Sequence, residues 1–321
     1  MSAATGVPLE WGPDRLDELT GLCAAALPDE RLSPDDLESI AFAPDVADPH
    51  GPFGTSVVLG TPDGIGAVVA SVRHASGAGQ PPTGFVQLVV VHPARRRRGV
   101  ARTLVRAAES WAAAHGAGAM QVGAAAPLYL FTGVDSRWTD AVCCFEALGY
   151  QRTGVELDLV CPTRGGPRVA TPRGIAVERV TSDDELAELV EWSDRCWPWW
   201  TPELARAGAA GTAVVARRRP DAAAGSEGGA GVVVGAAAHS VGRLGVIGPV
   251  AVDPELHGGG IGAAMMAEVL TQLSVAGLQR AEIAWVSTVR FYVRSCGAKV
   301  HRASQVLRRD LPSGTGRDAA G

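Results

Sequence analysis

The sequence lacks the features that would mark several specialised classes of protein. Its net charge of −5 at pH 7 argues against nucleic acid as the main partner. No apolar run reaches the roughly 18 residues of a membrane-spanning helix, and the N-terminus has neither the basic start nor the apolar segment of a signal peptide. The six cysteines form no C-x-x-C pair, which favours reduced thiols over a disulfide or metal framework. We therefore expect a cytoplasmic protein that binds no metal, nucleic acid or membrane.

The composition is that of an ordinary globular protein with room for two domains. Of the 321 residues, 46% are hydrophobic and 20% are charged, and this length allows two separate cores. Residues 162–174 are rich in proline and glycine, which do not sustain a helix or a central strand, and we interpret them as a linker. We expect an N-terminal domain over 1–161, a C-terminal domain over 175–311 and a disordered tail over 312–321.

Hydrophobic periodicity predicts the same order of elements in both halves. In the first half the expected order is helix 14–27, helix 33–42, strands 55–60, 65–74 and 84–92, helix 99–115, strand 120–126, helix 138–150 and strand 151–161. In the second half it is strand 175–180, helix 182–197, strands 212–218, 231–240 and 244–254, helix 260–276, strand 281–286, helix 287–297 and strand 298–311. Helices mixed with hairpins predict an α+β fold, in which each domain is a mixed, mostly antiparallel twisted sheet flanked by helices.

One strand–turn–helix pattern occurs twice. Residues 86–107 read VQLVVVHPARRRRGVARTLVRA, and residues 246–267 read VIGPVAVDPELHGGGIGAAMMA. In each copy an apolar strand leads into V-x-P, then a turn that contains glycine, then a helix. The equivalent prolines, Pro93 and Pro254, lie 161 positions apart, about half the chain. This repeat indicates two related domains.

Such a turn is suited to binding a phosphate. The first N–H groups of the helix and its dipole attract an anion, and glycine lets the backbone approach it closely. Residues 95–98 are all arginine, which fits either contacts with phosphate or a solvated basic face.

The two turns resemble motif A, Q/R-x-x-G-x-G/A, of the GNAT superfamily of N-acetyltransferases, over Arg96 to Ala101 and over His257 to Gly262. The resemblance implies two tandem GNAT-like domains and acetyl-CoA as co-substrate. It also implies that the strand before each turn pairs with pantetheine amides. The implied cofactor-binding residues of the first domain are Val89, Val90, Val91, Arg96, Arg97, Arg98, Gly99, Val100 and Ala101. Those of the second are Val250, Ala251, Val252, His257, Gly258, Gly259, Gly260, Ile261 and Gly262.

The resemblance also implies a catalytic tyrosine on the short helix before the last strand, placed to protonate the thiolate of CoA. Tyr292 matches this position in the second half, whereas Phe145 stands there in the first. A phenol donates a proton and a phenyl ring does not. We therefore expect turnover in the C-terminal domain and a degenerate N-terminal domain that lacks this acid.

A general base is less evident from the sequence. GNAT enzymes often carry a glutamate on the fourth strand, and neither copy of that strand contains one. Glu282, His239 and Asp253 are candidates, as is deprotonation through water. Asp135 and Arg137 either contact substrate or shape a loop. The tryptophans either line an acceptor pocket or belong to the core, and they are Trp192, Trp197, Trp199 and Trp200.

These features predict an N-acetyltransferase that transfers an acetyl group to a primary amine by direct attack, as a monomer or homodimer. The acceptor would be a small-molecule amine, a peptide N-terminus or a lysine. The two-domain arrangement and the stretch HPARRRRGVA also resemble mycothiol synthase, which acetylates a cysteinyl amine. A non-catalytic acyl-CoA-binding or sensor protein is the alternative from another class.

Overall fold

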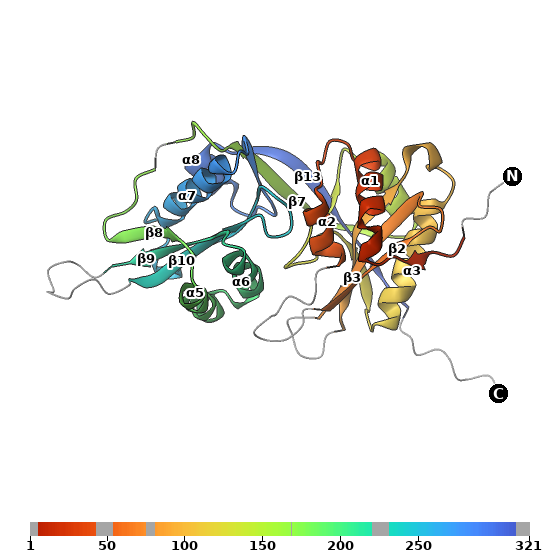
Figure 1. Ribbon diagram of the computed structural model, residues 1–321, viewed down its shortest axis with the longest axis horizontal. Helices are drawn as coiled ribbons and strands as arrows, with labels where there is room; N and C mark the ends of the chain where they lie inside the picture. Colours follow the sequence, from red (N-terminus) through yellow and green to blue (C-terminus); the bar gives the residue numbers. More distant parts are fainter. Residues whose placement is uncertain (1–5, 43–53, 75–80, 168, 220–230, 313–321) are drawn as a thin grey trace. The chain divides into compact units, whose positions relative to one another are not determined.

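The structure is a computed structural model that describes residues 6–42, 54–74, 81–167, 169–219 and 231–312. The chain forms two compact units (Figure 1). Unit 1 contains residues 1–156 and 303–321, and unit 2 contains residues 157–302. The predicted tail lies outside the described residues from 313 onwards.

Unit 1 is built on a mixed sheet. Its strands β1 (Leu9–Glu10), β2 (Gly54–Gly60), β3 (Gly66–Arg73) and β4 (Thr83–Val91) pair antiparallel in sequence order. Strand β4 then pairs parallel with β5 (Ala119–Val122), which pairs antiparallel with β13 (Lys299–Asp310). The helices are α1 (Leu16–Ala26), α2 (Pro34–Ala41), α3 (Val100–Ala114) and α4 (Thr139–Ala147), and the short strand β6 (Val134–Asp135) also pairs with β13.

Unit 2 repeats this plan. Strands β8 (Ile175–Arg179), β9 (Ala213–Arg218), β10 (Val232–His239) and β11 (Val246–Val252) are antiparallel, and β11 pairs parallel with β12 (Arg280–Ile283). The last partner of β12 is β7 (Gln151–Pro162), through its residues 159–162. The helices are α5 (Asp183–Cys196), α6 (Thr201–Ala209), α7 (Ile261–Val275) and α8 (Val289–Cys296). These two mixed sheets with their helices confirm the predicted α+β fold.

The final strand of each unit comes from the other half of the sequence. We predicted that residues 298–311 close the second half, but Arg308, Arg309 and Asp310 pair with β5 of unit 1. In the same way, residues 159–162, which we placed at the end of the first half and in the linker, pair with β12 of unit 2. The division of the chain therefore differs from a cut at 162–174, because an alternating pattern identifies a strand without identifying its partner.

Local signals explain where the main helices begin. Ser33 and Ser182 each form a capping box with the residue three positions on, Asp36 and Glu185. Two details of the prediction were wrong. The strand expected over 120–126 ends at Val122, where Gly123 turns away with a φ of 73°, and helix α6 was not predicted at all.

The sheet of unit 2 has a core on each face. Helices α7 and α8 cover one face around Met265, Val269 and Ile283, and α5 and α6 cover the other around Leu189 and Leu204. Figure 1 shows these two pairs of helices on opposite sides of β9 and β10. In unit 1, α3 and α4 pack on the strands in one continuous core. Side chains from α7 and α8 can therefore reach the central strand β11 from one face of the sheet, and side chains from α5 and α6 can reach it from the other.

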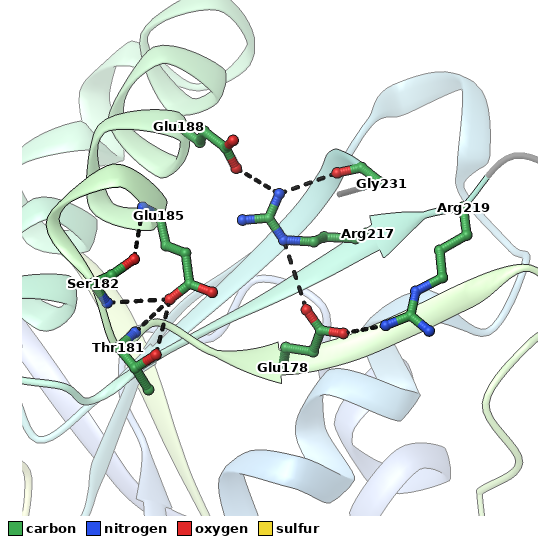
Figure 2. A network of polar contacts seen from close by, with 8 residues as sticks. All are labelled: Glu178, Thr181, Ser182, Glu185, Glu188, Arg217, Arg219 and Gly231. Atoms are coloured by element: carbon green, nitrogen blue, oxygen red, sulfur yellow. Dashed lines mark hydrogen bonds and ion pairs between the residues drawn. The ribbon is translucent and has the colours of Figure 1, made fainter. Parts of the chain in front are cut away.

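A buried arginine ties α5 to the edge of the sheet in unit 2 (Figure 2). Arg217 of β9 is 4% exposed. Its Nη1 lies 2.5 Å from Glu188 Oε2 and donates to the Gly231 carbonyl at 3.0 Å, and its Nε lies 3.8 Å from Glu178 Oε2. Three acceptor contacts around one buried cation, with the capping box of Ser182 beside it, hold the start of α5 on β8 and β9.

Candidate active site

The central strands separate from their parallel neighbours in both units. In unit 1 the parallel ladder joins Thr83–Val86 to Ala119–Val122 and, among the described residues, includes no later residue of β4. In unit 2 it is limited to Val246 and Ile247 of β11. Among the described residues, the backbone groups of 89–91 and 250–252 therefore lie beyond the parallel ladders.

The two glycine-bearing turns have the same backbone path. Gly99 and Gly260 are the N-cap residues of α3 and α7, with φ of 83° and 84°. Two positions earlier, Arg97 has a φ of 62° and Gly258 a φ of 83°. These left-handed conformations favour glycine, so Arg97 is strained where its counterpart is not.

His257 and Arg96 hold the turns in the same way. His257 Nε2 lies 3.1 Å from the Val252 carbonyl oxygen, and Arg96 Nε donates to the Val91 carbonyl oxygen at 3.3 Å. Arg96 also donates to the Ala26 carbonyl at 2.9 Å. The histidine thus replaces the longer side chain in bonding the end of the strand to the turn.

A cavity of about 1070 Å³ lies over the separated strands of unit 1. Residues 86–91 form one wall, the first turns of α3 and α4 contribute to others, and Arg95, Arg97 and Arg102 lie on its lining. This volume is slightly above the range of about 300–1,000 Å³ that is usual for ligand sites. The predicted residues Val89, Arg96, Gly99 and Ala101 line it, as do the other members of the first predicted set except Arg98.

Tyr292 and Phe145 occupy equivalent helices, and each is a buried member of the hydrophobic core of its unit. Tyr292 is 8% exposed, and burial raises its pKa to about 12, so the phenol stays protonated at neutral pH. Its ring packs edge-on against Phe291 at 4.8 Å, and Phe291 lies over Gly262 in the first turn of α7. Phe145 is 2% exposed and belongs to the core of unit 1.

The three candidate bases have structural partners. Glu282 forms an ion pair with Arg243 at 2.5 Å, and Asp253 Oδ1 accepts from Trp192 Nε1 at 2.7 Å. His239 contacts Ser240 Oγ and Gln272 Oε1, both at 3.1 Å, and burial lowers its pKa. These contacts hold all three side chains in the frame of unit 2.

The candidate residues in the loop and among the tryptophans lie in different environments. Asp135, 1% exposed, accepts from the backbone and side chain of Arg137, which is a structural pairing. Trp192 is buried in the core. The other three tryptophans form an aromatic group, in which Trp197 stacks on Trp200 at 5.1 Å and on the His257 ring at 6.4 Å, while Trp199 lies edge-on to both indoles.

Sequence reasoning missed two residues beside the central strands. Gln87 is 3% exposed and lines the unit 1 cavity. Glu203, on the unpredicted helix α6, is 9% exposed, and burial raises its pKa to about 8. A glutamine inside an otherwise apolar strand was a visible signal, whereas nothing in the sequence around Glu203 indicated burial.

Comparison with known proteins identifies the class. The sequence model of the acetyltransferase (GNAT) family matches residues 19–129 and 186–298. Similar structures include a tandem GNAT protein from the clavulanic acid biosynthesis pathway, with 19% identity, a TM-score of 0.65, and coverage of 95% of this chain and 98% of that one. A GCN5-related N-acetyltransferase from Sphaerobacter thermophilus has 19% identity, a TM-score of 0.60 and 95% coverage of both chains.

A third similar structure is the glucosamine N-acetyltransferase region of a fungal multi-domain β-N-acetylglucosaminidase. It has 20% identity and a TM-score of 0.70, over 94% of this chain and 38% of that one. No curated protein sequence matches the chain. Because its two matched regions cover more than half of its length, this chain belongs to the GNAT acetyltransferase family, with two GNAT domains in tandem, and is an acyltransferase.

The described residues contain no helix that is long and apolar enough to cross a membrane. The same part of the chain has no group of three or more His, Cys, Asp or Glu side chains that could hold a metal ion.

Proposed function

We propose that the protein transfers an acetyl group from acetyl-CoA to a primary amine, and that turnover takes place in unit 2. The observation that carries the assignment to unit 2 is the difference between the equivalent helices α8 and α4. Tyr292 offers a neutral phenol with a raised pKa, whereas Phe145 has no proton to donate.

The residues of both units suit acetyl-CoA. In each unit a left-handed glycine opens the helix N-terminus to a phosphate, and the separated strand leaves backbone groups for amides. In unit 2 the pyrophosphate would lie against the backbone of 258–262 and the pantetheine against 250–252. In unit 1 the large cavity, with arginines on its lining, supports a second site.

The reaction needs an uncharged amine, a polarised thioester and a protonated leaving group. When bound, acetyl-CoA supplies the acetyl group as a thioester. Backbone N–H groups of β11 are expected to stabilise the negative charge that develops on the carbonyl oxygen. The C–N bond forms as the C–S bond breaks, the attacking nitrogen loses its extra proton to a base or to water, and Tyr292 gives its proton to the departing sulfur.

Unit 1 fits a binding role without turnover. It has the cavity and the glycine turn, but Phe145 replaces the acid and Gln87 offers an amide in place of a base. We propose that it binds an acyl-CoA as a structural or sensing site. The six cysteines, all free thiols in the structure, support a cytoplasmic location for this activity.

The test is release of free CoA, measured with a thiol reagent, over a panel of amines and lysine peptides. A cysteinyl amine is followed by mass spectrometry, which also tests the mycothiol synthase alternative. We expect Tyr292→Phe to lower kcat by on the order of 10- to 1000-fold and to leave acetyl-CoA affinity nearly unchanged. Tyr150→Phe, which removes the same hydroxyl from a buried tyrosine of unit 1, is the control. Equal kcat for Tyr292→Phe and wild type would refute the assignment to unit 2.

A further inference from the structure

The two units differ at one position in the middle of the central strand. In unit 1, Val69 pairs with Leu88 and Ala70 with Val86, so Gln87 is the extra residue of a β-bulge. In unit 2, the register shifts between Ala237 and His239, and the residue equivalent to Gln87 in the repeat is Gly248. Bulges re-aim side chains and are frequent beside active sites. The bulged position of unit 1 therefore carries a polar side chain, that of Gln87, whereas the equivalent position in β11 of unit 2 is a glycine without a side chain.

Glu203 fills that place in unit 2. A side chain on Gly248 would collide with Oε1 of Glu203, so the carboxyl lies where the side chain of the bulged residue would otherwise be. Helix α6 begins directly after the turn that carries Trp197 and Trp200, and its first turn brings the carboxyl onto β11. A helix from one face of the sheet thus supplies the polar group that the strand lacks.

The carboxyl has no structural task to explain its burial. Among the described residues, Glu203 makes no hydrogen bond or ion pair, and it is 9% exposed. Its oxygens are not among the fully enclosed polar atoms that lack a partner. A carboxyl without a partner in apolar surroundings costs stability, and proteins retain such groups mainly at functional sites.

Burial is the cause of the raised pKa of Glu203. The titratable side chains on the elements packed against α6 include His239 of β10 and Cys196 of α5, and Arg206 lies one turn further along α6. None of them contributes a charge effect to the pKa of Glu203. The apolar surroundings of the carboxyl therefore account for its raised pKa, and an amine that binds beside it would lie in the same surroundings.

We propose that Glu203 is the general base of unit 2 and accepts a proton from the acceptor amine as its nitrogen attacks the thioester. This proposal deepens the proposed function and depends on it. The nitrogen of the neutral amine forms the C–N bond and loses a proton to Glu203, the C–S bond breaks, and the thiolate takes a proton from Tyr292. Transfer of a proton from Glu203 to Tyr292 through solvent then restores both groups, so the atoms and charges balance.

The position also indicates the class of acceptor. An alkyl ammonium has a pKa near 10 and is charged at neutral pH. Helix α6, which carries Glu203, begins directly after the turn that holds Trp197 and Trp200, and indole rings offer such a cation a cation–π partner. The site therefore fits a primary amine on an apolar or aromatic body better than an acidic or highly polar acceptor.

The test compares Glu203→Gln with wild type, using phenylethylamine, butylamine and a lysine peptide as probes. We expect kcat to fall by on the order of 10²- to 10⁴-fold, while calorimetry shows acetyl-CoA affinity unchanged. The activity that remains should increase with pH up to the pKa of the amine, about 10, because free amine then forms without the base. A merely structural role for Glu203 would not move this pH profile. Glu191→Gln, which removes an exposed carboxylate from α5, should behave as wild type.

A second variant approaches the same carboxyl from the strand. Gly248→Ala should displace the carboxyl and lower kcat, and adding it to Glu203→Gln should have little further effect. If wild type is active and Glu203→Gln retains kcat within about threefold and the same pH profile, the role of Glu203 is refuted. If wild type binds acetyl-CoA but acetylates no amine, the proposed function itself fails, and this is seen without any variant.

Discussion

Replacing Glu203 by glutamine should stabilise the protein, and more so as the pH increases. The carboxyl has a pKa of about 8 in the folded state against an ordinary value of 4.5. Below 4.5 it is protonated in both states and has no effect. Between 4.5 and 8 unfolding releases its proton, so stability falls as the pH increases, and above 8 the full penalty remains. Glutamine has the same shape and does not titrate, so the variant escapes this penalty.

The pKa difference sets the size of the effect. At 1.36 kcal/mol per pKa unit, a change from 4.5 to about 8 corresponds to ~5 kcal/mol of stability. This is an upper limit, because the ionised carboxylate draws in water and its surroundings relax. We expect a measured gain of about 1–3 kcal/mol for Glu203→Gln at the alkaline end and close to none at the acid end.

The assay is urea unfolding of both proteins at a series of pH values between about 5 and 9. The informative quantity is the difference in the free energy of unfolding at each pH, because titration of all other groups cancels. Glu191→Gln, at an exposed site, should give a difference that is small at every pH. A flat difference for Glu203→Gln would mean that the carboxyl titrates normally, and the reasoning from its burial would be wrong.

Three further predictions concern the glycine turns and the sheet edge. Gly260→Glu should weaken acetyl-CoA binding by calorimetry at least about tenfold, or roughly 1.4 kcal/mol, because a side chain at φ 84° is strained and its charge repels pyrophosphate. Gly99→Glu should affect only a site in unit 1. If Gly99→Glu abolished turnover and Gly260→Glu did not, the roles assigned to the two units would be reversed. Arg97→Gly should increase the free energy of unfolding by about 0.5–1 kcal/mol by relieving a φ of 62°. An unchanged midpoint in urea would contradict this. Arg217→Met should lower the free energy of unfolding by about 1–3 kcal/mol, less than the loss of a fully enclosed ion pair, because its glutamate partners are partly exposed. Arg218→Met, at an exposed neighbouring site, is the control. Equal losses of stability in the two variants would rule out a special role for the network in Figure 2.

Much of the fold was predictable because its signals are local. The capping boxes at Ser33 and Ser182 and the glycines that start α3 and α7 were visible as short motifs. The backbone of each depends on residues within a single turn. Tyr292 was placed on its short helix for the same reason. Its role, and those of the predicted cofactor residues, stay predictions.

The candidate site was predictable only in part because its chemistry depends on distant residues. Glu282, His239 and Asp253 seemed available as bases, but the partners that hold them lie far along the chain or on other elements. Glu203 is 45 positions before Gly248, and only the packing of α6 on β11 brings its carboxyl to the bulge. Burial and pKa arise from that packing, and no nearby sequence feature encodes them.

The sequence by itself determined two α+β repeats, their strand–turn–helix phosphate motifs and the difference between Tyr292 and Phe145. Each of these depends on features that span only a few positions: the hydrophobic period, the placing of glycine in a turn, and the type of a single residue. The tertiary structure alone decided that β13 pairs with β5 and residues 159–162 with β12. It also decided which carboxyl lies beside the central strand. Strand partners and buried contacts are chosen by the free energy of the whole packed unit, and many pairings satisfy the same alternating pattern.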